Sequence, residues 1–205
     1  MDRTWVYAGL AVAAGVGLAK LLHRGPRVLP GQTRLLLLGD SLAVGLGPHV
    51  QCLAADQRIP FRALAKTSTR VDQWAQSAAL DSTLASWKPT LALVSLGTND
   101  AYVAGAASRQ KPWLDQLLAK LAAAGVEVAW IGPPTLPATS MGKPDAAWLA
   151  ELQAAIPASH WFPSAALTIP RGPDNLHPSA RGYAGWAGGI WHWLSGPPSA
   201  ACGVQ

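Results

Sequence analysis

The sequence predicts a three-layer α/β/α domain built on a parallel sheet of about five strands. Short, continuously apolar segments alternate with longer segments of helical spacing between residues 34 and 194. The apolar segments lack the alternation of a strand with one wet face, so the sheet is expected to be covered on both sides. Half of the 205 residues are hydrophobic and 13% are charged, which suits one domain with a sizeable core.

Five apolar segments are expected to form the strands. The first contains four consecutive leucines, and the fifth is short and carries the residues HWFPSAA. In chain order, the expected strands are 34–40, 61–67, 90–100, 126–134 and part of 160–166. With about five strands, the flavodoxin-like order 2-1-3-4-5 is the natural arrangement.

A helix is expected after each strand. The third ends at a glycine, Gly125, and the fourth begins with a proline, Pro144, as helix boundaries often do. In chain order, the expected helices are 42–56, 71–87, 111–125, 144–156 and 178–194. The domain is therefore expected to cover residues 34–195.

The chain before the domain is apolar. Residues 4–19 carry no charge, and Lys20 follows them, so residues 1–23 are expected to form a helix. This helix could anchor the chain in a membrane through residues 5–22, act as a cleaved signal peptide, or pack on protein. The protein would then be membrane-associated or exported, with its sidedness open. Residues 24–33 form a Pro/Gly-rich linker, and residues 196–205 a flexible tail.

The charge distribution argues against nucleic-acid binding. The formal net charge is +5, but five cations lie in the first 34 residues against one acid. From residue 35 onward, eleven cations face ten acids, which leaves no basic stripe to follow phosphates. Cys52 lies in an expected helix and Cys202 in the tail, so their positions do not establish a disulfide, and no Cys/His set has zinc spacing.

Polar residues follow the first three strands, where ligands bind in parallel sheets. Ser41 follows the first strand, Thr69 the second and Asn99 the third, while Asp174 and His177 precede the last helix. A serine hydroxyl needs a base to accept its proton, and the base needs a third group to orient it. Asp174 and His177 can supply both functions to Ser41.

Each of these residues also has a purely structural interpretation. Ser41 could cap the helix that follows it, Asp174 could be a turn residue, and His177 could lie at an exposed helix start. Asn99 could bond only to its own turn. The neighbouring acids Asp40 and Asp100 are expected to brace loops rather than to react.

Three motifs in order, GDSL (39–42), GTND (97–100) and DNLHPSARGY (174–183), resemble those of the SGNH-hydrolase, or GDSL-type esterase/lipase, superfamily. The resemblance implies that Ser41 is the nucleophile, His177 the general base and Asp174 the orienting carboxylate. It also implies that Ser41, Thr69 and Asn99 donate to the substrate oxyanion, and that neither a metal nor an organic cofactor is needed.

One position departs from the family pattern. The family has a glycine after the second strand, and here that position falls on Thr69. The threonine keeps the backbone N–H but adds a branched side chain, which narrows the pocket and restricts the backbone.

The expected activity is hydrolysis of carboxylic esters, on carbohydrate or of lipid type, through an acyl-enzyme on Ser41. A non-catalytic binding module of the same fold and an acyltransferase with the same triad are the alternatives. Loops 101–110 and 135–143 are expected to shape the acyl pocket. The tryptophans, which include Trp186, Trp191 and Trp193, are expected in the core or on a membrane-facing surface, with a carbohydrate platform as the alternative.

Overall fold

The computed structural model describes residues 31–196 and Cys202. Its sheet is parallel throughout and has the order β2-β1-β3-β4-β5, which confirms the expected order. The strands are β1 Leu35–Gly39, β2 Phe61–Ala65, β3 Leu91–Ser95, β4 Glu127–Ile131 and β5 Trp161–Phe162.

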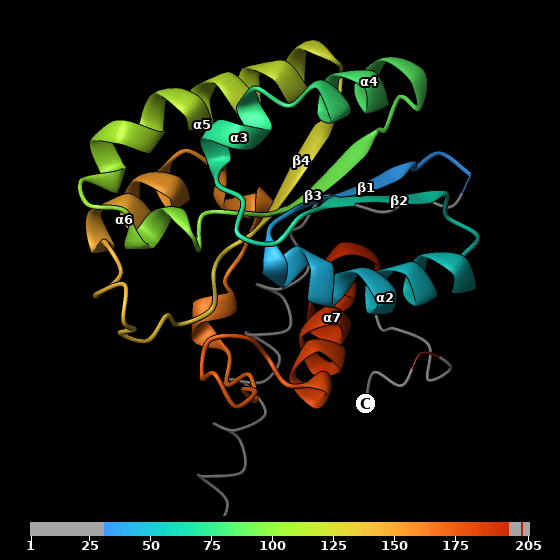
Figure 1. Cartoon of the computed structure of the whole chain (residues 1–205). Coiled ribbons are helices and arrows are strands. Elements are labelled where there is room, and N and C mark those ends of the chain that lie inside the picture. Colours follow the sequence, from blue (N-terminus) through green and yellow to red (C-terminus); the bar gives the residue numbers. More distant parts are fainter. Residues whose placement is uncertain (1–30, 197–201, 203–205) are drawn as a thin grey trace, which may run out of the picture.

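Helices cover both faces of this sheet (Figure 1). One face carries α2 and α7, and the other carries α3, α4, α5 and α6. The helices are α2 Ser41–Asp56, α3 Val71–Ala75, α4 Ala78–Ser86, α5 Ala106–Ala123, α6 Ala146–Ala154 and α7 Ala180–Ser195. Single 3₁₀ turns lie at Asp100–Tyr102, Ala158–His160 and Ser164–Ala166.

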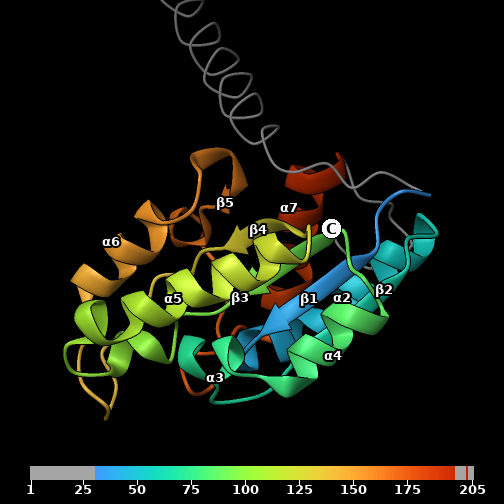
Figure 2. The same cartoon turned by 90° about the horizontal axis from the view of Figure 1, so that it is seen from above.

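The four leucines of β1 show why the strand needs no polar face. Leu35 and Leu37 pack toward α2 and α7, while Leu36 and Leu38 pack toward the other layer. All four are fully buried, because successive side chains of a strand point to opposite faces. The view from above shows α3, α4 and α5 on the near side of the sheet and α7 beneath it (Figure 2).

The carboxyl end of β1 lies very close to β3. A Cβ atom on Gly39 would come within 2.1 Å of the Ser95 carbonyl oxygen, so only glycine fits at this position. The next residue, Asp40, donates its backbone N–H to the same oxygen at 3.1 Å. This contact places the polar residues that follow the two strands next to each other.

Two expected elements differ in the structure. The helix expected at 71–87 is divided into α3 and α4 at Ser77, whose hydroxyl accepts from the Leu80 N–H and caps α4. The third helix begins at Ala106 rather than at 111, so the segment expected as the loop 101–110 is largely helical. In both cases a local feature sets the helix boundary: the Ser77 cap begins α4, and α5 begins shortly after the turn at Asp100–Tyr102. Hydrophobic periodicity carries no signal for such boundaries.

The apolar segment 1–23 and the linker up to residue 30 lie outside the described residues. Among residues 31–196 and Cys202, no helix is long and apolar enough to cross a membrane. The tryptophans Trp186, Trp191 and Trp193 are buried core residues in the layer of α2 and α7, which decides between the two locations expected for them.

The structure joins Cys52 to Cys202 by a disulfide, which the sequence does not predict. Cys52 lies on α2, and the pair is separated by 150 residues in the chain. Cys202 also packs against the core between α2 and α7. The tail is therefore attached at this residue to the helix that begins with Ser41.

Candidate active site

Three side chains that are far apart in the sequence form a continuous hydrogen-bonded series. The Oγ atom of Ser41 lies 2.8 Å from Nε2 of His177, and Nδ1 of the same ring lies 2.5 Å from Oδ2 of Asp174. An ionised carboxylate only accepts hydrogen bonds, so Nδ1 carries a proton toward Asp174. In the neutral ring, Nε2 is then the acceptor for the Ser41 hydroxyl.

Ser41 is presented at the first position of α2. The residue before it, Asp40, caps this helix: its Oδ1 accepts from the Leu42 N–H at 2.9 Å. The structure thus assigns the capping function to Asp40 and leaves the Ser41 hydroxyl facing His177. The first amides of a helix have no partner within it and carry a partial positive charge, which suits binding of an oxyanion near Ser41.

A tight loop before α7 holds Asp174 and His177. Oδ1 of Asp174 accepts from the backbone N–H groups of Leu176 at 3.0 Å and His177 at 2.9 Å. Together with the His177 side chain, which has the largest effect, these bonds lower the pKa of Asp174 to about 2. Asp174, whose side chain is half exposed, is therefore held in its ionised form.

Arg171 fixes the same loop from outside. Its guanidinium donates to the Leu176 carbonyl oxygen and, at 2.7 Å, to the Thr135 carbonyl oxygen. The loop also closes on itself, because the Gly172 N–H donates to the His177 carbonyl oxygen at 2.8 Å. Arg171 thus connects the His177 loop to segment 135–143, which is expected to shape the acyl pocket.

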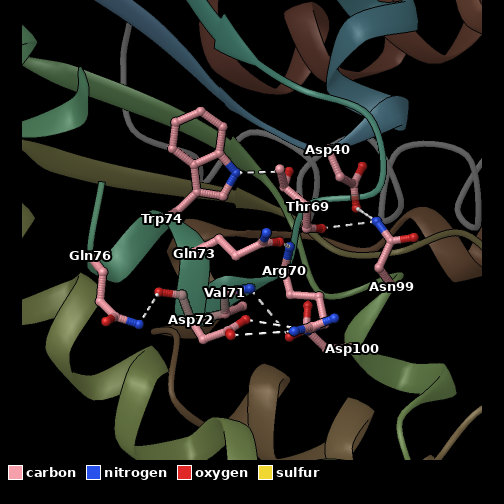
Figure 3. Close-up of polar contacts among 10 residues, drawn as sticks. All are labelled: Asp40, Thr69, Arg70, Val71, Asp72, Gln73, Trp74, Gln76, Asn99 and Asp100. Carbon is pink, nitrogen blue, oxygen red and sulfur yellow. Dashed lines mark hydrogen bonds and ion pairs between the residues drawn. The ribbon is translucent and has the colours of Figure 1, made fainter. Parts of the chain in front are cut away.

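The other side of the site contains Asn99 and Thr69 (Figure 3). Nδ2 of Asn99 donates to the Thr69 carbonyl oxygen at 2.9 Å and lies 3.4 Å from Oδ2 of Asp40. Both neighbours are oxygens, which identifies the amide nitrogen as the atom that faces them. Both N–H groups of this planar amide therefore have partners, and the bond to Asp40 is the longer and weaker of the two.

Two carboxyl groups beside Asn99 are fully buried. Burial raises the pKa of Asp40 to about 7, against opposing effects of the Leu42 N–H and of His177. Burial likewise raises the pKa of Asp100 to about 7, and here the Val71 N–H opposes the shift. Oδ1 of Asp100 accepts from that N–H at 3.2 Å. Both residues brace loops, as the sequence predicts.

The structure brings together all five residues that the sequence proposes for the site. Ser41, Asp174 and His177 are joined directly, and Asn99 joins Thr69 to the neighbourhood of Asp40. Sequence reasoning missed Arg171 and Trp74, whose indole N–H donates to Oγ1 of Thr69 at 3.0 Å. A buried tryptophan needs a partner for its N–H, but the sequence cannot show which one.

The described residues also contain no cluster of three or more histidine, cysteine, aspartate or glutamate side chains that could hold a metal ion. The local chemistry is that of a hydroxyl group, an imidazole and a carboxylate in series at the carboxyl ends of parallel strands. This arrangement is the one that serine hydrolases use on several unrelated folds.

The family comparison agrees with this class. A model of the GDSL-like lipase/acylhydrolase family matches residues 37–184. The chain belongs to this family, and it is a hydrolase that acts on ester bonds. The matched range contains all the site residues described in this section and ends within α7. No curated protein sequence matches the chain.

Solved structures share the fold at low sequence identity. The esterase EstA from Pseudoalteromonas sp. is 19% identical, with a TM-score of 0.59 over 77% of this chain and 93% of that one. TesA is 20% identical, with a TM-score of 0.59, and the match covers 78% of this chain and 96% of that one. Axe2, an acetylxylan esterase from Geobacillus stearothermophilus, is 14% identical, with a TM-score of 0.57, and the match covers 84% of this chain and 98% of that one. These similarities establish the fold and leave the substrate open.

Proposed function

We propose that the protein is a serine esterase that hydrolyses carboxylic esters through an acyl-enzyme on Ser41. His177 accepts the proton from the Ser41 hydroxyl as its oxygen attacks the ester carbonyl carbon. The alcohol then leaves with that proton, and a water molecule activated by His177 releases the acid and restores Ser41. Asp174 keeps the imidazole in the orientation that these steps need.

The observation that carries the proposal is the uninterrupted series from Ser41 Oγ through His177 to Asp174. Its distances of 2.8 Å and 2.5 Å are those of hydrogen bonds that are already formed. A serine that served only as a helix cap would bond to a backbone N–H of its own helix. Here Asp40 has that function, so the Ser41 hydroxyl is available to react.

Developing charge on the carbonyl oxygen needs donors on the opposite side. We assign this function to the backbone N–H of Ser41, the side-chain amide of Asn99 and the backbone N–H of Thr69. Thr69 engages its hydroxyl and its carbonyl oxygen in bonds to the protein, which leaves its N–H as the group to face the substrate.

The proposed substrates are esters whose acyl group is either a short group on carbohydrate or a lipid-type chain. Two structural neighbours support the first class, because they are described as acetylxylan esterases. The family description, which includes both lipases and acylhydrolases, supports either class.

The test is hydrolysis of p-nitrophenyl acetate, butyrate and a longer-chain ester by the full-length protein, with Ser41→Ala as the control. We expect turnover that depends on Ser41, and the chain-length profile then selects the substrate class. Full retained activity in folded Ser41→Ala would contradict the proposal.

We also propose that the domain works in an oxidising compartment, attached to a membrane by the apolar N-terminal segment or exported by it. The support is the Cys52–Cys202 disulfide, since such bonds persist mainly outside the reducing cytosol. Alkylation of the protein in cells of its source, before lysis, should find both thiols blocked. Two free thiols would contradict this location.

A further inference from the structure

The loop between β2 and α3 carries a branched side chain, Thr69, at the position where the resemblance to the SGNH-hydrolase superfamily leads us to expect a glycine. Thr69 is 5% exposed, and its side chain is turned into the protein. Its hydroxyl donates to the Lys66 carbonyl oxygen at 2.7 Å, and it lies 3.4 Å from the Gly39 carbonyl oxygen. The hydroxyl thus bonds within its own loop, beside the end of β1.

The same hydroxyl is an acceptor for a buried indole. Trp74 lies on α3, is 7% exposed, and donates from Nε1 to Thr69 Oγ1 at 3.0 Å (Figure 3). A hydroxyl can accept and donate at once, so the indole orients the Thr69 hydroxyl proton toward Lys66. Lys66 is itself fixed, because its backbone N–H donates to the Gly39 carbonyl oxygen at 3.0 Å.

The backbone from the Thr69 carbonyl to Val71 is held by Asn99 and Asp100, which follow β3. The Thr69 carbonyl oxygen accepts from Asn99, and the Val71 N–H donates to the adjacent Asp100. The residue before Thr69, Ser68, has a φ of 60°, which only a loop fixed by its surroundings imposes on a residue with a side chain. The bonds of the Thr69 carbonyl oxygen and hydroxyl, together with the positive φ of Ser68, therefore restrict the backbone that carries the Thr69 N–H.

We propose that Trp74 is a positioning residue of the oxyanion hole, and that the Trp74–Thr69 pair replaces the glycine of the family. The indole N–H holds the Thr69 side chain against Lys66, which keeps the branched side chain out of the substrate space and the backbone N–H directed into it. This inference rests on the proposed function, because it concerns stabilisation of the oxyanion during ester hydrolysis.

Four variants of the full-length protein test the pair. Trp74→Phe removes the indole N–H and keeps an aromatic ring, while Thr69→Val removes the hydroxyl and keeps the branched shape. Thr69→Ser keeps the hydroxyl, and the double variant Trp74→Phe/Thr69→Val removes both partners. Trp186→Phe is the matched control, because its indole N–H also donates to a buried hydroxyl, Ser164 Oγ at 3.0 Å, but on the other face of the sheet.

The readouts are kcat and KM for a p-nitrophenyl ester, and the affinity for an alkyl boronic acid, whose tetrahedral anionic adduct with serine mimics the intermediate of ester hydrolysis. We expect Trp74→Phe and Thr69→Val each to lower kcat about 10- to 100-fold with KM within about 2-fold, and to weaken boronate binding in proportion. The double variant should be no worse than the poorer single variant, because both changes break one unit. Thr69→Ser should recover most of the kcat that Thr69→Val loses, and Trp186→Phe should retain kcat within about 3-fold.

The outcomes distinguish a failure of the Trp74 inference from a failure of the proposed esterase function. Wild-type protein without Ser41-dependent turnover overturns the proposed function and the inference with it. Active wild type together with folded Trp74→Phe of unchanged kcat overturns the inference alone. Multiplying effects in the double variant, or a change in KM without a change in kcat, also overturn it. Melting temperatures of all variants show which of them are folded.

Discussion

The two sides of the active site hold their carboxyl groups in opposite ways. Asp174 is half exposed, and hydrogen bonds from His177 and its own loop lower its pKa to about 2. Asp40 and Asp100 are fully buried, and burial raises the pKa of each to about 7. The exposed carboxylate is kept charged to orient a base, whereas the buried carboxyl groups fix backbone beside the proposed oxyanion donors.

This difference predicts that substitutions of His177 or Asp174, on the exposed side, abolish proton transfer from Ser41. Substitutions on the buried side are expected to weaken stabilisation of the transition state or to alter folding stability. The imidazole is the strongest test of the exposed side. We expect His177→Ala to lower kcat about 10⁵- to 10⁶-fold, because the ring nitrogen that is hydrogen-bonded to the Ser41 hydroxyl is then lost. The measurement is single-turnover hydrolysis of p-nitrophenyl acetate, and activity within 10-fold of wild type would contradict the assignment.

Asp174→Asn tests whether the negative charge beside His177 is needed for activity. The amide cannot act as a charged acceptor for Nδ1 and favours the wrong tautomer of His177, so we expect kcat to fall about 10⁴-fold. Because the pKa of Asp174 is about 2, this carboxylate stays ionised above that pH, and its loss of charge cannot limit activity between pH 4 and 7. A pH–rate profile of the wild type with an acid limb near pH 4 that Asp174→Asn removes would contradict this.

On the buried side, Asn99→Ala removes a proposed oxyanion donor and leaves Ser41, His177 and Asp174 in place. We expect kcat to fall about 10²- to 10³-fold, less than for either triad variant. The fluorophosphonate reactivity of Ser41 should persist at a reduced rate. An effect on kcat as large as that of His177→Ala would show that the two sides do not act separately.

Asp100→Asn gives the smallest effect, on folding stability rather than chemistry. Its folded-state pKa of about 7 exceeds the unfolded value near 3.8, so the folded protein binds the extra proton between those pH values. Stability associated with this group is therefore present below pH 4 and is lost as pH rises through 7. The amide cannot ionise and keeps an oxygen for the Val71 N–H.

We expect Asp100→Asn to gain melting temperature relative to wild type as pH rises from 4 to 8, by at least about 2 °C, the shift that 1 kcal/mol produces in a chain of this size. Thermal melts of both proteins at each pH give this difference directly. A difference that stays constant with pH would show that Asp100 does not titrate in this range.

The sequence predicts the sheet order and all five proposed site residues, because each motif follows a strand or precedes the last helix. Contacts within the loops escape prediction for a physical reason. The bond from Trp74 to Thr69 depends on the conformation of the loop before α3, including the positive φ of Ser68, and hydrophobic periodicity does not specify that conformation. The Cys52–Cys202 disulfide likewise joins residues 150 positions apart, and their sequence positions do not show that they meet.

Reaction of the full-length protein with a fluorophosphonate, followed by intact mass and peptide mapping, tests the central claim most directly. Such reagents label a serine only when a base activates it. The account predicts one label per chain, on Ser41, with no label in Ser41→Ala and much slower labelling in His177→Ala. Folded wild-type protein that remains unlabelled, or labelling at another residue that persists in Ser41→Ala, would contradict it.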